Sequence, residues 1–143
     1  MKTVRHILST KGPDVFAVAP DASVYEALQI MADKNVGALV VLEAGRLVGI
    51  ISERDYARKV ILEDRRSLDT PVSQIMTSDV TVVDPALPID SCMELMTEHH
   101  IRHLPVLEDD ELLGVISIGD VVNAVIADLA AMVDQLDSYI RSG

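Results

Sequence analysis

Aromatic residues and cysteine are scarce in this sequence. Its 143 residues include no Trp, one Phe and three Tyr. Proteins that bind single-stranded nucleic acid stack its bases on aromatic side chains, so we do not expect this ligand here. Cys92 is the single cysteine, which excludes an intrachain disulfide and favours a reducing compartment.

Long apolar runs and positive charge are also lacking. No run approaches the length of a membrane span, and the first residues lack the apolar stretch of a signal peptide, so we expect a cytoplasmic protein. The formal net charge of −11 argues against nucleic acid or an anionic membrane as a partner. Residues 71–143 hold two Lys/Arg, Arg102 and Arg141, against thirteen Asp/Glu, whereas residues 1–70 hold ten of each kind.

What the chain does contain is an internal repeat. Residues 14–61 align with residues 79–126 without a gap when 65 is added to each number, and sixteen of these 48 positions are identical. The preceding segments, residues 4–8 and 72–76, resemble each other too. The sequence therefore predicts two related domains, residues 1–69 and 70–143, with a polar linker at 64–70.

Each copy predicts the same order of elements. A short extended segment (15–18 or 80–83) precedes an amphipathic helix, which Ser23 caps in the first copy and which Pro88 begins in the second. Two β-rich runs follow, 38–42 and 47–52 or 103–107 and 112–117, and a second helix begins at Glu53 or Ile118. This is an α/β fold of two βαββα repeats, and each copy alone would bury only a marginal core.

The final helix extends beyond the end of the repeat. Apolar residues continue at spacings of three and four through Leu129, Met132, Val133, Leu136, Tyr139 and Ile140. Two interpretations carry equal weight: the helix folds back on its own domain, or it forms a self-association surface and the protein is a homodimer.

A Ser-x-x-Asp element recurs where a strand ends and a helix begins. It comprises Ser52 and Asp55 in the first copy and Ser117 and Asp120 in the second, each preceded by Gly three residues before the Ser. Free N–H groups at a helix start favour a phosphate, and the Asp carboxylate can accept hydrogen bonds from a ribose diol. The same pattern also fits a helix capping box, which needs no ligand.

The two copies resemble CBS domains, the family named after cystathionine β-synthase. The matching stretches are residues 36–41, residues 101–106 and the two Gly-h-h-Ser-x-x-Asp elements. Residues 51–55 and 116–120 resemble those of small stand-alone pairs found in bacteria and plant organelles. The resemblance implies a tandem CBS-domain pair, two βαββα repeats packed by pseudo-twofold symmetry, that commonly dimerises. It also implies that the module is a non-catalytic sensor for adenosyl ligands (AMP, ADP, ATP, NAD or S-adenosylmethionine) held in the cleft between the repeats, and that it regulates an unknown protein.

The resemblance also assigns roles to individual residues. Asp55 and Asp120 would hold ribose, and Ser52 and Ser117 would lie near ribose or phosphate. Val36 and Ile101 would help form the adenine pockets. Arg102 and His103 would be a basic pair at the phosphate. The first copy has Gly37 and Ala38 where the basic pair stands, with Arg54, Arg58 and Lys59 after its motif, and Arg54 is the one we expect to bind ligand.

Other chemistry is weakly indicated. The sequence shows no nucleophile–base arrangement and no Walker-type loop, so we predict no enzyme activity and no catalytic cofactor. His99, His100 and His103 are not at a recognised metal-ligand spacing, and we predict no metal site. Cys92 falls on the apolar face of a helix, where we expect a small buried side chain. The alternative to a ligand sensor is a ligand-free structural or protein-interaction module.

Overall fold

The computed structural model describes residues 2–12, 14–63 and 66–142. The chain forms two compact units that do not follow the sequence repeats. We call residues 14–81 the inner unit, and residues 1–13 together with 82–143 the split unit. Most of each repeat lies in its own unit, but the segment preceding each repeat belongs to the unit of the other.

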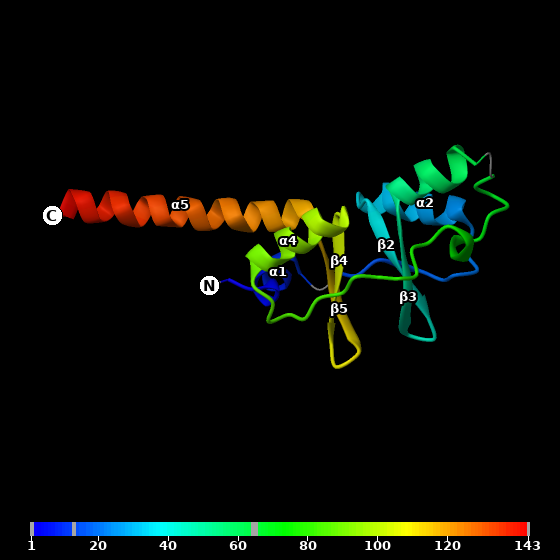
Figure 1. Cartoon of the computed structure of the whole chain (residues 1–143), viewed down its shortest axis with the longest axis horizontal. Coiled ribbons are helices and arrows are strands. Elements are labelled where there is room, and N and C mark those ends of the chain that lie inside the picture. The colour runs from blue at the N-terminus through cyan, green and yellow to red at the C-terminus, as the bar shows by residue number, and fades with distance from the viewer. Residues whose placement is uncertain (1, 13, 64–65, 143) are drawn as a thin grey trace. The chain divides into compact units, whose positions relative to one another are not determined.

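The inner unit is built on a three-stranded sheet in the order β1-β2-β3, with β1 parallel and β3 antiparallel to β2. Figure 1 labels its two longer strands, β2 and β3. Its elements in chain order are β1 (Ala17–Val18), α2 (Val24–Lys34), β2 (Ala38–Glu43), β3 (Arg46–Ser52), α3 (Glu53–Tyr56), the π-helix η1 (Ala57–Ile61) and the 3-10 helix η2 (Val72–Gln74).

The split unit contains an antiparallel hairpin and three helices. These are α1 (Val4–Lys11), α4 (Ile89–His99), β4 (His103–Glu108), β5 (Glu111–Ser117) and α5 (Ile118–Ser142). The hairpins of the two units bulge at equivalent positions, between Val41 and Leu42 and between Val106 and Leu107. The repeat in sequence is therefore a repeat in backbone geometry.

Local sequence signals account for the element boundaries. The Ser23 hydroxyl accepts a hydrogen bond from the backbone N–H of Glu26 at 3.1 Å, and Pro88 is the N-cap of α4. Asn35 and His100 end α2 and α4 in the left-handed conformation, each with φ of 55°. The four predicted strands of the two hairpins and the predicted helix starts are confirmed to within a residue or two.

The extended segment expected at residues 80–83 is wrong as a strand. It is reduced to a single parallel bridge between Val83 and Val106. In the inner unit the backbone N–H of Val40 bonds the carbonyl of Phe16, which extends the pairing of β1 with β2. Pro105 occupies the equivalent place in β4 and has no N–H to donate, so the second copy cannot make this bond.

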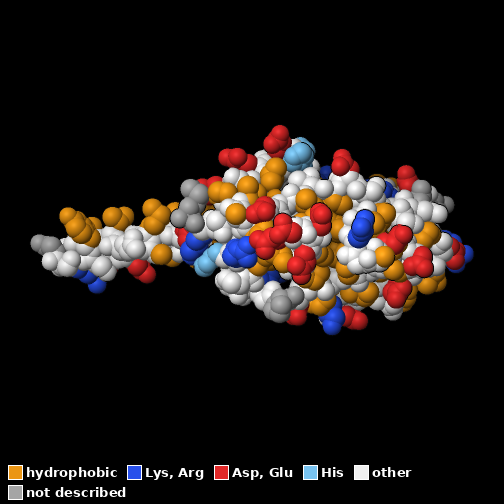
Figure 2. Space-filling view, turned by 90° about the horizontal axis from the view of Figure 1, so that it is seen from below, with side chains coloured by type: hydrophobic (Ala, Val, Ile, Leu, Met, Phe, Trp, Pro, Cys, Tyr) orange, Lys and Arg blue, Asp and Glu red, His pale blue; other side chains and the backbone are white. Residues whose placement is uncertain are grey.

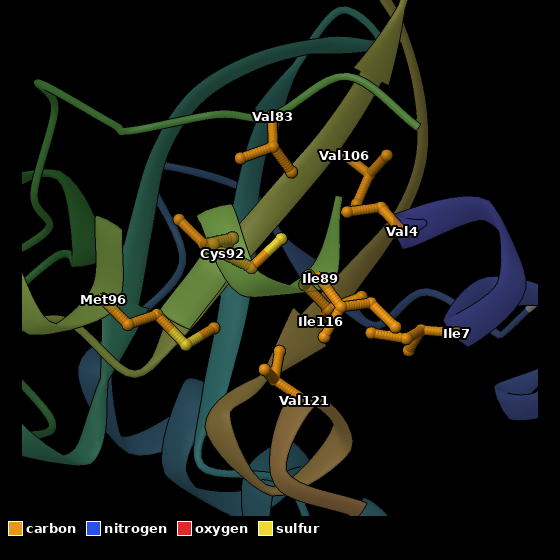
Figure 3. Close-up of a cluster of buried hydrophobic side chains, with 10 residues drawn as sticks. Val4, Ile7, Val83, Ile89, Cys92, Met96, Val106, Ile116 and Val121 are labelled. Carbon is orange, nitrogen blue, oxygen red and sulfur yellow. The ribbon is translucent and has the colours of Figure 1, made fainter. Parts of the chain in front are cut away.

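Each unit has its own core, completed by the segment that precedes the other repeat. Val4 and Ile7 of α1 are buried among residues of the second repeat, including Ile89, Cys92 and Ile116 (Figure 3). Val72 and Ile75 of the η2 region are buried in the same way in the core of the inner unit. The compact units therefore do not coincide with residues 1–69 and 70–143, because each unit includes the segment that precedes the other repeat.

The last part of α5 does not fold back on the split unit. Val121 is buried and Ala124 and Val125 pack against the core, but the helix then runs on beyond α1 and α4 (Figure 1). Seven apolar side chains from Ile126 to Ile140 are 56–78% exposed. Across the described residues, no helix is both long and apolar enough to cross a membrane.

Candidate functional site

The strand–helix junction of the split unit is a capping box around the start of α5. The backbone N–H of Ser117 donates to Oδ2 of Asp120 at 2.8 Å, and the backbone N–H of Asp120 donates to the Ser117 hydroxyl at 3.1 Å. These reciprocal bonds satisfy N–H groups that have no partner within the helix. The capping interpretation of the motif is therefore confirmed here, and a ligand role would be additional to it.

Lys11 adds a cation that the capping box does not require. Its Nζ atom lies 2.8 Å from Oδ2 of Asp120 and donates to the carbonyl of Val115 at 2.7 Å. Lys11 is the last residue of α1, so a segment from the beginning of the chain supplies the charge partner of a carboxylate more than one hundred residues away. The pair is partly exposed, with 36% of the Lys11 and 25% of the Asp120 side chain accessible.

The charges at this junction favour an ionised carboxylate and a neutral imidazole. Burial raises the pKa of Asp120, but the hydrogen bond from Lys11, those from Ser117 and the Lys11 charge together outweigh it and hold this pKa below its ordinary value. Burial lowers the pKa of His103, and the charges of Lys11 and Arg102 lower it further against the opposing effect of Asp120. Positive charge near neutral pH therefore comes from Lys11 and Arg102.

The junction of the inner unit repeats the capping box with different partners. The backbone N–H of Ser52 donates to Oδ2 of Asp55 at 3.0 Å, and the backbone N–H of Asp55 donates to the Ser52 hydroxyl at 3.3 Å. On the other carboxylate oxygen, Oδ1 accepts a hydrogen bond from the Thr77 hydroxyl and lies 3.3 Å from Nζ of Lys59. Lys59 also donates to the carbonyl of Ile75 at 3.0 Å.

The two carboxylates therefore differ in how fully they are engaged. Among the described residues, the hydrogen bonds and the ion pair of Asp120 all involve Oδ2, so Oδ1 can accept from a ligand hydroxyl. Asp55 uses both oxygens, and only 13% of its side chain is exposed. The junction of the split unit can accept a diol with less rearrangement than that of the inner unit.

The other predicted site residues lie near their own junctions. Val36 and Ile101 are partly buried against the cores of the inner and split units, respectively. Arg102 is exposed, and its carbonyl accepts the backbone N–H of Ile118, the first residue of α5. Arg54 is exposed in the first turn of α3, a helix of four residues.

Sequence reasoning did not identify Lys11 or Thr77. Both follow the segments that precede the repeats, and these segments were assigned to the repeat they precede rather than to the one they contact. The repeated glycines lie where these segments approach the hairpins closely. A Cβ at Gly114 would lie 2.8 Å from Cδ2 of Leu8, and a Cβ at Gly49 would lie 3.0 Å from the Thr77 carbonyl oxygen.

The described part of the chain does not favour a metal site or a reactive thiol. It contains no group of three His, Cys, Asp or Glu side chains placed to hold a metal ion. Cys92 is fully buried in the split-unit core, as predicted, and burial raises the pKa of its thiol.

The comparison with protein families identifies the class of protein. The model of the CBS domain matches residues 4–62 and 72–127, so the chain belongs to the CBS domain family and carries two copies. Such pairs are regulatory modules, and the α/β fold with two repeats is that of a tandem CBS pair.

Individual relatives cover most of the chain. The CBS domain-containing protein CBSX3, mitochondrial, of Arabidopsis thaliana is 39% identical over 150 residues, covering 99% of this chain and 73% of that protein. The CBS domain-containing protein YhcV of Bacillus subtilis is 32% identical and covers 84% and 83% of the two chains. A protein with CBS domains from Burkholderia ambifaria is 48% identical with a TM-score of 0.86, covering 89% of this chain and 96% of its own.

Proposed function

We propose that the chain is a non-catalytic regulatory module that binds an adenosyl ligand at the Ser-x-x-Asp junctions. The second repeat provides the stronger site. The ligand class comprises AMP, ADP, ATP, NAD and S-adenosylmethionine, which share adenine and a ribose. Asp120 accepts the ribose hydroxyls, Ile101 contacts the base, and Arg102 with Lys11 faces the phosphate or other charged group.

The observation that carries the proposal is the Asp120 carboxylate, which is held ionised next to a cation with one oxygen available. A helix cap alone needs neither the cation nor the free acceptor. A ribose diol bound to Oδ1 would leave the capping box intact. The Lys11 Nζ and the start of α5 then offer positive charge to a phosphate in a region that is otherwise acidic.

The fold is compatible with this ligand class. A CBS domain pair of the protein MJ0100 was crystallised with 5′-methylthioadenosine and S-adenosyl-L-methionine, and it matches this chain with a TM-score of 0.79. Because the two are 23% identical, this likeness concerns the fold alone, and the ligand of the present chain stays a proposal.

Calorimetry with AMP, ATP, NAD and S-adenosylmethionine tests the proposal. Asp120→Asn keeps an oxygen for the cap but removes the charged acceptor, so affinity should fall about tenfold to a hundredfold. The matched variant Asp55→Asn should change the affinity of the stronger site by less than about threefold. Unchanged affinity in Asp120→Asn, or no heat of binding for any of the four ligands, would contradict the proposal.

The reciprocal capping boxes support a second candidate, a ligand-free structural or protein-interaction module. In that case both Asp variants lower the melting temperature, and no adenosyl ligand raises the melting temperature of the wild type. A ligand-dependent rise that Asp120→Asn abolishes and Asp55→Asn retains would exclude this candidate.

The proposal includes a second protein that this module regulates. A ligand can transmit a signal only by binding two arrangements of the chain unequally, so the regulated protein must distinguish them. We expect neither nucleic acid nor a membrane as a partner, since the chain is strongly acidic.

A cytoplasmic location stays a prediction, and the Arabidopsis relative carries a mitochondrial name, so fractionation of the native host is the direct test.

A further inference from the structure

The exposed face of α5 has a regular seven-residue pattern. Six of its exposed apolar residues are spaced by four and three residues in strict alternation: Val122, Ile126, Leu129, Val133, Leu136 and Ile140. In heptad notation Ile126, Val133 and Ile140 occupy the a positions, all β-branched, and Leu129 and Leu136 occupy d positions with Val122. β-Branched residues at a with Leu at d favour two-stranded coiled coils, a preference known from parallel pairs, so the flanking positions must decide the direction.

This seam is exposed along the part of α5 that lies beyond the core. Figure 2 shows hydrophobic side chains gathered along one edge of the projecting helix. Residues 126–142 span about 25 Å of helix. Their apolar side chains with Val122 expose on the order of 500 Å² per copy, which is the larger share of the roughly 800 Å² that a stable interface buries on each partner.

We propose that α5 pairs with α5 of a second copy of this chain as an antiparallel two-stranded coiled coil. The inference is independent of the proposed ligand. In the antiparallel register each a residue meets a d residue: Val133 faces the partner's Leu129, Ile126 faces the partner's Leu136, and Ile140 faces the partner's Val122. Every layer of the seam is then apolar.

The flanking positions select the antiparallel direction. The g positions are Val125, Met132 and Tyr139, and in an antiparallel pair g residues meet g residues. Met132 then meets the partner's Met132, and Tyr139 meets the partner's Val125. In a parallel pair g meets e, which would place Met132 against the charge of the partner's Asp137. The antiparallel e positions bring Ala130 to Ala130 and Asp137 to Asn123, so no like charges meet.

The width of the apolar face fits the same arrangement. Val125 packs against the core of its own split unit, whereas Tyr139, on the same side of the helix, is 78% exposed. An antiparallel partner brings its own Val125, and with it the surface of its split unit, to Tyr139. The exposed Tyr thereby gains an apolar neighbour that the seam alone would not supply.

Two single-cysteine additions distinguish the directions. Ile126→Cys and Leu136→Cys, one carrying a tag that changes its mass, are oxidised separately and as a mixture. Antiparallel pairing gives a disulfide between the two variants in the mixture, because residues 126 of two copies then lie about 15 Å apart and cannot link. Disulfides within each variant alone would overturn the antiparallel direction. Wild type is the control, since Cys92 is fully buried.

Light scattering and sedimentation test the seam itself. Val133→Asp should raise the dimer dissociation constant about a hundredfold or more, because the change enters the seam from both copies. Gln135→Asp adds the same charge to an exposed position off the seam and should change the dimer dissociation constant by less than about threefold. Val133 is largely exposed in the single chain, so both variants should keep the wild-type circular dichroism. A wild type that is monomeric at about 100 µM, or a Val133→Asp variant that dimerises like the wild type, would overturn the proposal.

Discussion

At the scale of single residues, the junction of the split unit joins a capping box, an ion pair and a partly buried imidazole. Asp120 takes part in the first two, and His103 lies close enough to Asp120, Lys11 and Arg102 for their charges to act on it. Because the two titrating groups respond to acid in different ranges, their contributions to stability can be separated by pH.

Acidification should destabilise the split unit first through His103. The pKa of His103 in the folded chain lies below its ordinary value of about 6.5. The stabilisation that the neutral imidazole gives is therefore complete above about pH 6.5, and it is lost as the pH falls through the folded pKa. We expect the melting temperature to fall more between about pH 7 and 5 in the wild type than in His103→Asn. Equal slopes for the two proteins would contradict this assignment.

The Asp120 contribution should disappear at lower pH. The pKa of this carboxyl is held below its ordinary value of about 3.9, so the stabilisation is complete above that pH and declines as the pH falls through the folded pKa. Asp120→Asn should therefore be less stable than the wild type near neutral pH and approach it below about pH 4. Denaturant titrations of both proteins at several pH values measure this convergence.

The two repeated glycines should tolerate a methyl group unequally. At Gly114 the added Cβ would meet the end of the Leu8 side chain, which can move, whereas at Gly49 it would meet the Met76 side chain and the backbone carbonyl of Thr77. We expect Gly114→Ala to cost about 1–2 kcal/mol and Gly49→Ala more, with Leu8→Ala offsetting part of the Gly114→Ala cost in the double variant. A purely additive double variant would show that Leu8 is not the obstacle.

At the scale of elements, helical periodicity, caps and the 65-residue repeat were sufficient to predict both hairpins and the three longest helices. The extended segment of the second copy failed because one proline removes a donor that the first copy uses. The Ser, Asp and basic residues of the junctions were predicted, but Lys11 and Thr77 were not. Sequence similarity showed that residues 4–8 match residues 72–76, and it holds no information on which core each segment joins.

The exchange of N-terminal segments predicts which unit each segment stabilises. Ile7→Ala should cost about 2–4 kcal/mol in the split unit, because Ile7 is buried in that core. Amide hydrogen exchange should accelerate in residues 82–127 and remain unchanged in residues 14–63. Ile75→Ala occupies the matching position in the other segment and should produce the reverse pattern. Faster exchange in residues 14–63 of Ile7→Ala would contradict the assignment.

At the scale of the whole molecule, net charge opposes self-association. Each chain carries a formal charge of −11, so two copies repel one another even though the α5 seam is uncharged. Raising the salt from about 0.05 to 0.5 M shortens the range of this repulsion and should strengthen the dimer. Sedimentation at several salt concentrations measures the trend. A dimer that weakens with salt would indicate association through opposite charges instead of the apolar seam.

The placement of α1 has a consequence for the order in which the protein matures on the ribosome. Residues 4–11 are synthesised before the whole inner unit, yet their core consists of residues that follow position 82. At roughly 5–20 residues per second, some 4–14 s pass before synthesis even reaches that position. All core residues of the inner unit, up to Val72 and Ile75, are synthesised before that point, while Val4 and Ile7 still lack the residues that cover them. Residues 4–11 are thus made before the inner unit but can reach their native contacts only after it has been synthesised.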